Sequence, residues 1–386
     1  MRQHIIALVD CDCFYVSCER KDNPDLQGKP VCVMTGGGNK GIIVSRAKEA
    51  KALGVKMGQP YFQVKPNFPT AICIPARMHR YAEISEEVMD TIRTFSPDVE
   101  VTSVDEAYID LTSLNKVYHS TYTDIIKNIR QAIWDKVKIP VSIGLGTSKT
   151  LAKLASDKAK SNNGIFVIPA DKILDIVGNM PIEDVSGIGR KNSEHMKFSG
   201  IFTIKDFVEK DNGWIRKAFG INGLSIKSEL SGIATSLVNN EPTAPQSIQD
   251  TRSFEDFTQN LEYLEHEING HVHTACQKLR RWNGFCQVVE VMLRTKDFKF
   301  YSTEAKLPNP TNGDQEVRMT AVRLLKSLYR PNLIYRSTGV TLKNLTYGNQ
   351  VQQSLFEETK PHDDKLSHLV DELEAKFGKG IIKTGV

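Results

Sequence analysis

The chain has 386 residues, of which 40% are apolar and 25% are charged, and its formal net charge is +4. This length exceeds what one hydrophobic core usually serves, and the composition excludes global disorder and a fibrous repeat, so we expect two to four domains. No stretch approaches eighteen consecutive apolar residues, and Asp10 comes too early for a signal peptide, so we expect a cytoplasmic protein without membrane contact.

The seven cysteines are an odd number at irregular spacing, which favours reduced and mostly buried thiols over a disulfide framework. Charge is distributed unevenly along the chain. Thirteen Lys or Arg stand against five Asp or Glu between Lys278 and Lys343, whereas seven acids stand against three bases between Glu357 and Lys376. A basic block of this size suits a phosphate backbone, although a solvated face of dispersed charge would have the same composition.

The first 170 residues have the pattern of an α/β region. Short apolar runs predict strands at residues 5–9, 30–34, 41–44, 99–104, 107–111 and 141–145. Apolar residues at four-residue intervals predict two amphipathic helices, one around 84–92 and one around 125–133. A further helix follows the last of these strands, and either Thr147 or Ser148 can cap it.

After about Pro169 the pattern becomes helical, with glycine turns at residues 187–189, 200 and 220. Residues 238–247 contain two prolines and no apolar period, which indicates a linker. Beyond the linker, the order strand, helix, strands, helix, strand predicts a compact α+β module, and an acidic helix follows near the end of the chain.

Three acids lie at the ends of predicted strands. Asp10 closes the first apolar strand, and Asp105 with Glu106 lies between two later strands. Carboxylates at the tips of buried strands are costly to place unless a cation gathers them. Hard oxygen ligands without His or Cys favour magnesium, and two such ions about 4 Å apart can drive a phosphoryl displacement. Taken singly, each acid could instead cap a turn.

The surroundings of these acids resemble a known family. Residues 10–19 (DCDCFYVSCE), 103–110 (SVDEAYID) and 141–156 (VSIGLGTSKTLAKLAS) are similar, in this order, to three motifs of the Y-family DNA polymerases, the UmuC/DinB-type translesion enzymes. The resemblance covers roughly residues 1–350, and the stretch 49–58 is most similar to the UmuC branch. It implies a lesion-bypass, low-fidelity DNA polymerase that acts in DNA repair and SOS mutagenesis.

The resemblance also implies an α+β multidomain fold shaped as a right hand. The expected parts are a palm (1–18 and 77–170), small fingers (19–76), a helical thumb (171–237), a linker (238–247), an α+β little finger (248–348) and a tail (349–386). The expected partners are primer–template DNA and dNTPs, and we expect the chain to be a monomer. In the implied reaction, the primer 3′-hydroxyl attacks the α-phosphate of a dNTP and pyrophosphate leaves.

By resemblance, Asp10, Asp105 and Glu106 hold two Mg²⁺ ions, with the backbone carbonyl of Cys11 as a further ligand. Glu106 is expected nearest the primer hydroxyl, and positioning with charge neutralisation performs most of the catalysis in such chemistry.

The resemblance assigns the incoming nucleotide to five further residues. Tyr15 matches the steric gate, an aromatic ring placed where a ribose 2′-hydroxyl would stand, and Phe14 lies beside the sugar. Lys48, Lys51 and Lys160 are the candidates for the triphosphate. DinB-like members have a Tyr and an Arg in place of Lys48 and Lys51. The contacts with the triphosphate are therefore expected to differ here, because a Lys ammonium cannot make the bidentate hydrogen bonds of an Arg.

Residues 144–150 superficially look like a P-loop, but Ser148 stands where that motif requires a glycine, so we reject this interpretation. Gly144 and Gly146 are then expected to permit a tight turn from strand to helix.

Residues 185–191 resemble a helix-hairpin-helix, whose glycine turn holds a DNA phosphate on backbone N–H groups. An ordinary turn between two helices would have a similar sequence. The expected contacts here are Gly187, Gly189, Arg190 and Lys191. In the little finger, the basic block is expected to grip template backbone through Arg280, Arg281, Arg294, Lys296, Lys299, Arg318 and Lys343.

Residues 352–356 resemble the short peptide that docks bacterial polymerases onto the sliding clamp, with polar contacts from Gln352 and with Leu355 and Phe356 in an apolar groove. The alternative is an ordinary loop whose two apolar side chains pack against the rest of the chain. The chain ends soon after residues 377–380 without a recognisable finishing element, which leaves open that a longer protein continues beyond Val386.

Two other functions remain open from the sequence. A palm-type nucleotidyl cyclase also places carboxylates on strand tips, but it would need neither a thumb nor a basic second module. A non-catalytic helix-hairpin-helix repair factor would keep the DNA contacts, but it would not need Asp10, Asp105 and Glu106 together with Tyr15.

Overall fold

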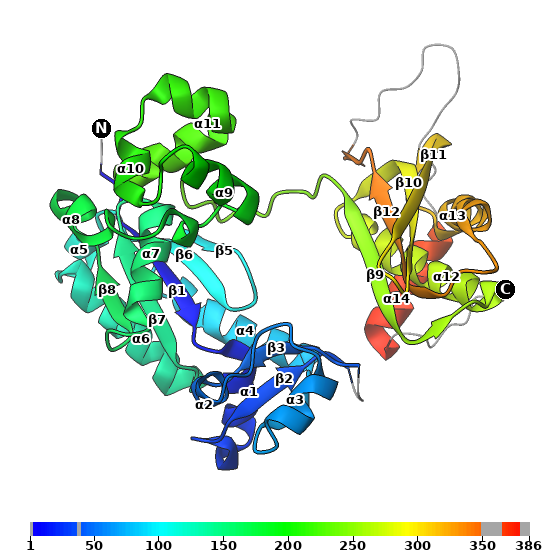
Figure 1. Ribbon diagram of the computed structural model, residues 1–386, viewed down its shortest axis with the longest axis horizontal. Coiled ribbons are helices and arrows are strands. Elements are labelled where there is room, and N and C mark those ends of the chain that lie inside the picture. Colours follow the sequence, from blue (N-terminus) through cyan, green and yellow to red (C-terminus); the bar gives the residue numbers. More distant parts are fainter. Residues whose placement is uncertain (1–2, 37–39, 349–364, 379–386) are drawn as a thin grey trace. The chain divides into compact units, whose positions relative to one another are not determined.

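The chain divides into two compact units, Met1–Pro242 and Thr243–Val386 (Figure 1). The computed structural model describes residues 3–36, 40–348 and 365–378. The boundary between the units lies within residues 238–247, the stretch predicted to be a linker. Within the described residues, no helix is long and apolar enough to cross a membrane.

A five-stranded sheet is the centre of the first unit. Its strands, in spatial order, are β5 (Val99–Val101), β6 (Glu106–Asp110), β1 (Ile6–Cys11), β7 (Val141–Gly146) and β8 (Ile165–Val167). Strand β1 is antiparallel to both of its neighbours, and every residue of β1 is buried. Burial on both faces explains why β1 is a continuous apolar run rather than an alternating one. Figure 1 shows blue, cyan and green strands in this one sheet, because distant parts of the sequence meet in it.

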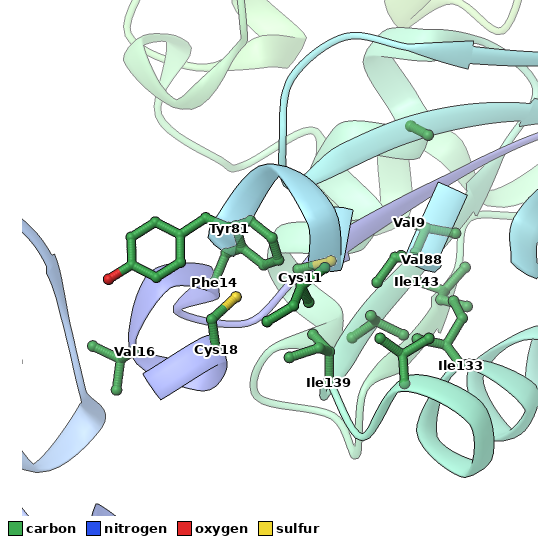
Figure 2. Close-up of a cluster of buried hydrophobic side chains, with 14 of the residues drawn as sticks. Val9, Cys11, Phe14, Val16, Cys18, Tyr81, Val88, Ile133, Ile139 and Ile143 are labelled. Atoms are coloured by element: carbon green, nitrogen blue, oxygen red, sulfur yellow. The ribbon is translucent and has the colours of Figure 1, made fainter. Parts of the chain in front are cut away.

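Helices cover both faces of the sheet: α4 (Met78–Arg93), α6 (Tyr122–Val137) and α7 (Lys149–Ala159). Side chains alternate along a strand, so β1 has two different environments. Figure 2 shows part of the first, in which Val9 and Cys11 belong to the same buried cluster as residues of α4 and α6. Ile6 and Leu8 point the other way and pack with Ala152 of α7. Asp10, which has the same parity as Ile6 and Leu8, therefore faces α7.

Helix α7 lies unusually close to β7 because two glycines of β7 leave room for it. A Cβ atom on Gly144 would lie 2.0 Å from the backbone nitrogen of Ser156 and 2.3 Å from the carbonyl oxygen of Ala152. A Cβ atom on Gly146 would lie 2.7 Å from the Cβ of Leu151. Neither glycine has a positive φ. The predicted tight turn is present, since only Thr147 and Ser148 separate β7 from α7, and the glycines permit it through close packing of strand and helix rather than through a positive φ.

The N-terminus of α7 is capped twice. The hydroxyl of Ser148 accepts a hydrogen bond from the N–H of Leu151, whereas the Thr147 hydroxyl is buried without a partner among the described residues. The Glu229 carboxylate then accepts from the Thr150 N–H at 2.9 Å and from the Thr150 hydroxyl at 2.8 Å. A carboxylate thus occupies the anion position at this helix N-terminus, which agrees with rejecting a P-loop.

A smaller sheet lies beside the first and shares its buried core. Its strands, in spatial order, are β3 (Ile43–Arg46), β2 (Val31–Met34) and β4 (Ile72–Pro75). The accompanying helices are α1 (Phe14–Asp22), a 3-10 turn Pro24–Leu26, α2 (Lys48–Ala52) and α3 (Tyr61–Asn67). Helix α5 (Leu114–Val117) instead follows β6 and contacts α6.

The predicted helical region follows β8, and its buried core includes Leu151 and Leu154 of α7. It consists of the 3-10 turns Ala170–Lys172 and Ile182–Asp184 and of the helices α8 (Ile173–Val177), α9 (Arg190–Phe198), α10 (Ile204–Glu209) and α11 (Asn212–Leu230). The glycine turn expected at 220 is a kink within α11, where Gly220 has a φ of 66°.

The chain beyond α11 runs back along the central sheet. Ala234 and Val238 pack on the face that carries Ile6 and Leu8. The N–H of Asn239 donates to Glu100 at 2.7 Å, and the Asn240 side chain donates to the carbonyl of Pro97 at 3.2 Å. The first three residues of the predicted linker are therefore bound to the first unit.

The second unit has the predicted order of strand, helix, two strands, helix and strand. These elements are β9 (Ile248–Thr258), α12 (Leu261–Arg280), β10 (Gly284–Thr295), β11 (Phe300–Thr311), α13 (Asp314–Leu328) and β12 (Tyr335–Lys343). The sheet is antiparallel in the order β11-β10-β12-β9, and α12 and α13 share its buried core. A short strand β13 (Thr346–Tyr347) pairs with β10, and the acidic helix α14 (Lys365–Phe377) contacts α12.

Candidate active site

The three acids singled out in the sequence come together at one end of the central sheet. Asp10 on β1 lies directly opposite Glu106 on β6 in the strand register. The N–H of the next residue, Cys11, donates to the carbonyl of Asp105 at 2.8 Å. Asp10 and Glu106, which are 96 positions apart, are thus neighbours because β1 and β6 pair antiparallel. Glu106 is the first residue of β6 rather than part of a junction between strands.

Two lysines of the α7 region bind these acids. The Lys153 ammonium lies 3.0 Å from Oδ2 of Asp10 and 2.8 Å from Oε2 of Glu106. The Lys160 ammonium lies 3.1 Å from the same oxygen of Asp10 and 3.2 Å from Asp157. Lys160 is among the residues predicted from the sequence, whereas Lys153 is not. Their separation of seven residues, which is about two helical turns and puts both on one helix face, is the signal that could have found it.

Both ammonium groups are held in the charged form. Burial acts to lower the pKa of Lys153, but its hydrogen bond to Glu106 and the charge of Asp10 outweigh burial and raise that pKa. Burial likewise acts to lower the pKa of Lys160, and the charges of Asp10 and Asp157 raise it above its usual value. The carboxylates therefore face two permanent cations at neutral pH.

Hydroxyl groups donate to three further carboxylate oxygens at these strand ends. Oδ1 of Asp105 accepts from the Ser103 hydroxyl at 2.5 Å, and Oε1 of Glu106 accepts from Thr102 at 3.0 Å. Asp12 accepts from the Ser142 hydroxyl at 2.8 Å. Burial raises the pKa of Asp12, although the bond from Ser142 and the charge of Lys48 act to lower it.

The donor chemistry of the site fits a hard divalent cation. Carboxylate oxygens of Asp10, Asp105 and Glu106 and the carbonyl of Cys11 are the type of ligand that Mg²⁺ prefers. Among the residues that the structure describes, however, no three acids, histidines or cysteines are gathered into a ligand cluster. Asp10 and Glu106 instead converge on one cation, the ammonium of Lys153, while Asp105 is bonded to Ser103.

The predicted steric gate, Tyr15, has a second tyrosine packed against one face of its ring. Tyr15 stacks on Tyr81 of α4, with ring centroids 4.6 Å apart and an interplanar angle of 17°. The Tyr81 hydroxyl donates to Glu19 at 2.6 Å, and Arg77 binds both oxygens of Glu19 at 2.9 Å. Phe14 is buried in the core that Figure 2 shows, together with Tyr81. Tyr81, Glu19 and Arg77 are not among the predicted site residues, because only the fold brings α1 and α4 together.

Tyr15 lies within the electrostatic reach of the acids. Burial raises the pKa of its hydroxyl, and the charge of Asp105 raises it further. Lys48 and Lys51 are exposed on the short helix α2, and Lys48 acts on the titration of Asp12. Cations from two separate elements, α2 and the end of α7, therefore flank the strand ends.

The glycine turn predicted to hold phosphate opens onto the same region. Gly187 has a φ of 90°, a left-handed conformation that favours glycine, and Gly189 is the N-cap of α9. Arg190 and Lys191 are exposed at the start of this helix. The turn and Lys153 both line a hollow of about 590 Å³. The hairpin's first arm is short, because only a 3-10 turn, Ile182–Asp184, precedes the glycines directly.

In the second unit, most of the predicted DNA contacts are accessible. Arg281 is exposed after the end of α12, and Arg294, Lys296 and Lys299 are exposed around the turn that joins β10 and β11. Arg318 is half-buried on α13.

Lys343 is half-buried on the sheet, and it binds Glu290 and Glu304 at 2.9 Å each. Two acids already compensate the charge of Lys343, so its attraction for phosphate is weaker than that of the residues around the β10–β11 turn.

Arg280 requires a correction. Its side chain is 2% exposed, and its guanidinium binds Asp314 at 2.7 Å, Asp371 at 2.6 Å and the carbonyl of Asn312 at 2.7 Å. Asp314 begins α13 and Asp371 lies on α14, so Arg280 joins three helices. The prediction that Arg280 grips template backbone is therefore wrong, because the guanidinium is enclosed and its donors are used. The candidate clamp residues Gln352, Leu355 and Phe356 lie outside the described residues.

Comparisons with known proteins agree with this architecture. Residues 9–157 match the model of the impB/mucB/samB family, and residues 245–355 match that family's C-terminal domain. Protein UmuC of Salmonella typhimurium is 31% identical, over 98% of this chain and 92% of that protein. A DNA polymerase IV of Desulfatibacillum aliphaticivorans is also 31% identical, over 99% of this chain and 96% of that protein.

Among solved structures, a Y-family DNA polymerase chimera, Dbh-Dpo4(243-245)-Dbh, superimposes with a TM-score of 0.78 at 25% identity, over 89% of this chain and all of that chain. The fold, with its paired carboxylates and separate α+β module, defines the class of right-hand DNA polymerases. Within that class, the chain belongs to the impB/mucB/samB family of Y-family DNA polymerases.

Proposed function

We propose that this translesion DNA polymerase transfers nucleotides from dNTPs to a primer 3′-hydroxyl with two Mg²⁺ ions held by Asp10, Asp105 and Glu106. The observation that carries the proposal is the register of β1 and β6, which pairs Asp10 with Glu106 and bonds Cys11 to Asp105. Side chains from distant stretches of sequence thereby share one sheet end within the matched residues 9–157.

When bound, the two ions supply activation of the attacking hydroxyl and stabilisation of the leaving oxygen. The chain itself supplies position and charge. Lys160 and Lys48 present ammonium groups to the triphosphate, and Lys51 on α2 is proposed to join them. Tyr15, held flat against Tyr81, is proposed to exclude a ribose 2′-hydroxyl, with Phe14 behind it.

Primer–template DNA is the proposed macromolecular substrate. Solved relatives include an insertion ternary complex of Dbh DNA polymerase, with a TM-score of 0.61 and 25% identity. In this chain the glycine turn with Arg190 and Lys191 and the exposed basic residues around the β10–β11 turn are proposed to hold DNA backbone. We assign the palm to 1–18 and 77–170, the fingers to 19–76, the thumb to 171–237 and the little finger to 248–348. Residues 352–356 are proposed to bind the sliding clamp.

Primer extension tests this function. The wild-type chain should extend a labelled primer on a template with Mg²⁺, and a chelator should stop extension. Asp105→Ala and Glu106→Ala should each abolish extension because each removes a proposed metal ligand. Asp110→Ala is the matched control: this acid also lies on β6, but it contacts His4 and the N–H of Thr112 instead.

Three outcomes would contradict the proposal in different ways. Extension that persists without Asp105 or Glu106 would exclude these residues as the site. DNA binding without extension by the wild type would indicate a non-catalytic repair factor. Nucleotide consumption that needs no primer would indicate a cyclase.

A further inference from the structure

The ammonium of Lys153 lies between two carboxylates that are proposed to bind metal. It is 3.0 Å from Asp10 and 2.8 Å from Glu106, and all three side chains are largely enclosed, with exposures of 23%, 11% and 25% for Lys153, Asp10 and Glu106. Lys153 therefore supplies, from within the chain, a positive charge that both acids share.

The acids need such a charge even in the absence of metal. Asp10 and Glu106 are directly opposite on neighbouring antiparallel strands, where like charges repel. Partial burial makes an uncompensated carboxylate more costly still. The charge of Lys153 satisfies both acids, and Lys160 adds a second ammonium on Asp10 only.

The position of Lys153 is fixed by the packing of its helix. Gly144 and Gly146 allow α7 to lie against β7, and Glu229 caps the N-terminus of α7. The same lysine lines the hollow that extends to the glycine turn at 187–189. The ammonium therefore has open space next to it that it can enter when it leaves the carboxylates.

We propose that Lys153 is an internal counter-ion that holds Asp10 and Glu106 in place in the metal-free enzyme and is displaced when a divalent cation binds. This inference rests on the proposed function, which makes these acids metal ligands. Metal binding is then an exchange of one cation for another. The affinity for metal is lower than the carboxylates alone would give, and the site stays assembled between successive metal loadings.

The experiment measures Mn²⁺ binding to the full chain, without DNA or nucleotide, from the EPR signal of free Mn²⁺. Lys153→Met keeps the length of the side chain and removes its charge, so it should bind Mn²⁺ about tenfold more tightly than wild type, a change of about 1.4 kcal/mol. Without metal, this variant should unfold at a lower temperature, and added Mn²⁺ should restore the loss. Lys158→Met on the same helix is the control, because Lys158 stacks on Phe166 instead.

Lys153→Arg provides a second test, which does not require the protein to fold with a neutral residue at position 153. Arginine stays charged and can bind carboxylates bidentately, so this variant should keep the wild-type thermal stability and bind Mn²⁺ no more tightly than wild type. Mn²⁺ affinity in Lys153→Met that equals or falls below that of wild type would overturn the counter-ion role.

Asp10→Asn separates this failure from failure of the metal site itself. If Asp10 is a ligand, Asp10→Asn weakens Mn²⁺ binding in the wild-type and Lys153→Met backgrounds alike. Mn²⁺ binding that is indifferent to Asp10→Asn would refute the proposed metal ligands, whatever Lys153 does.

Discussion

Arg280 and Arg281 are adjacent in sequence and have opposite environments. The Arg280 side chain is enclosed and binds Asp314 and Asp371, whereas Arg281 is exposed. Sequence alone could not separate them, because the acids that enclose Arg280 come 34 and 91 residues later. A basic block read from composition therefore contains both structural and accessible charges.

Replacing each of these arginines with methionine should have a different effect. Arg280→Met removes the guanidinium that Asp314 and Asp371 share and should lower the free energy of unfolding by about 3–5 kcal/mol. Arg281→Met should leave stability nearly unchanged, weaken DNA binding and reduce the slope of log affinity against log salt by about 0.9. Urea unfolding and fluorescence anisotropy across a salt series measure the two quantities. A reduced salt slope in Arg280→Met at full stability would contradict the buried assignment.

Tyr15 allows a test of sugar discrimination. Tyr15→Ala removes the ring that stacks on Tyr81, so the preference for dNTP over rNTP, measured as a ratio of kcat/KM, should fall on the order of 10–100-fold. Tyr118→Ala, which removes an exposed tyrosine bonded to the carbonyl of Phe95, is the control. Unchanged discrimination in Tyr15→Ala would mean that another group excludes the 2′-hydroxyl.

At the scale of elements, the contact between β7 and α7 positions Lys153 and Lys160 beside Asp10. Gly144→Ala would place a Cβ 2.0 Å from the backbone nitrogen of Ser156, so the helix must move away from the strand. The free energy of unfolding should fall by at least about 3 kcal/mol, because backbone atoms cannot relax as a side chain can.

Gly270→Ala in α12 is the matched control for Gly144→Ala. Its new Cβ meets no atom within 4 Å, so this change should stabilise the chain by up to about 1 kcal/mol. Thermal unfolding of both variants measures the difference. A Gly144→Ala protein as stable as wild type would show that α7 is not held by this close approach.

The elements that the sequence predicts well are those whose pattern is local. The apolar run of β1 and the four-residue periodicity of α4 and α6 predict those elements, because buried positions require apolar side chains and so leave a regular pattern in the sequence. Strands β4 and β8 are absent from the predictions, and none of their side chains is fully buried.

The candidate site follows the same rule. The motifs indicate Asp10, Asp105 and Glu106 directly, because each lies within a recognisable local pattern. The spacing of Lys153 and Lys160 puts both on one helix face, but the contact of Lys153 with Asp10 joins residues 143 apart, and that of Tyr15 with Tyr81 joins residues 66 apart. Local patterns do not encode these partners.

At the scale of the whole molecule, stability is divided between two units with separate cores, and the second unit contains a charge cluster of its own. His273 on α12 lies 2.6 Å from Asp314 and 2.9 Å from Glu374 of α14. The bond to Asp314 raises the pKa of His273 to about 9 despite burial, and Glu374 contributes further. A raised pKa stabilises the fold fully below the unfolded value of about 6.5, and this stability is lost as pH rises through about 9.

Alkaline pH should therefore weaken the second unit selectively. Between pH 7 and pH 10, calorimetry should show a falling unfolding temperature for that unit, because neutral His273 no longer pairs with Asp314 and Glu374. His273→Gln should flatten this pH dependence, since Arg280 and the acids around it keep their charges. Equal pH dependence in wild type and variant would assign the effect to other groups.

The tether between the two units is much shorter than its sequence indicates. Asn240 is bonded to Pro97 of the first unit, and the carbonyl of Pro245 accepts a hydrogen bond from Tyr347 of the second. The five steps from Asn240 to Pro245 span at most about 17 Å. With the DNA contacts proposed above for both units, such a tether would give each unit a local concentration of about millimolar toward DNA bound by the other, so that two weak contacts would act as one bivalent contact. Each residue inserted between Glu241 and Ala244 should lower the avidity for DNA without removing any contact that either unit makes.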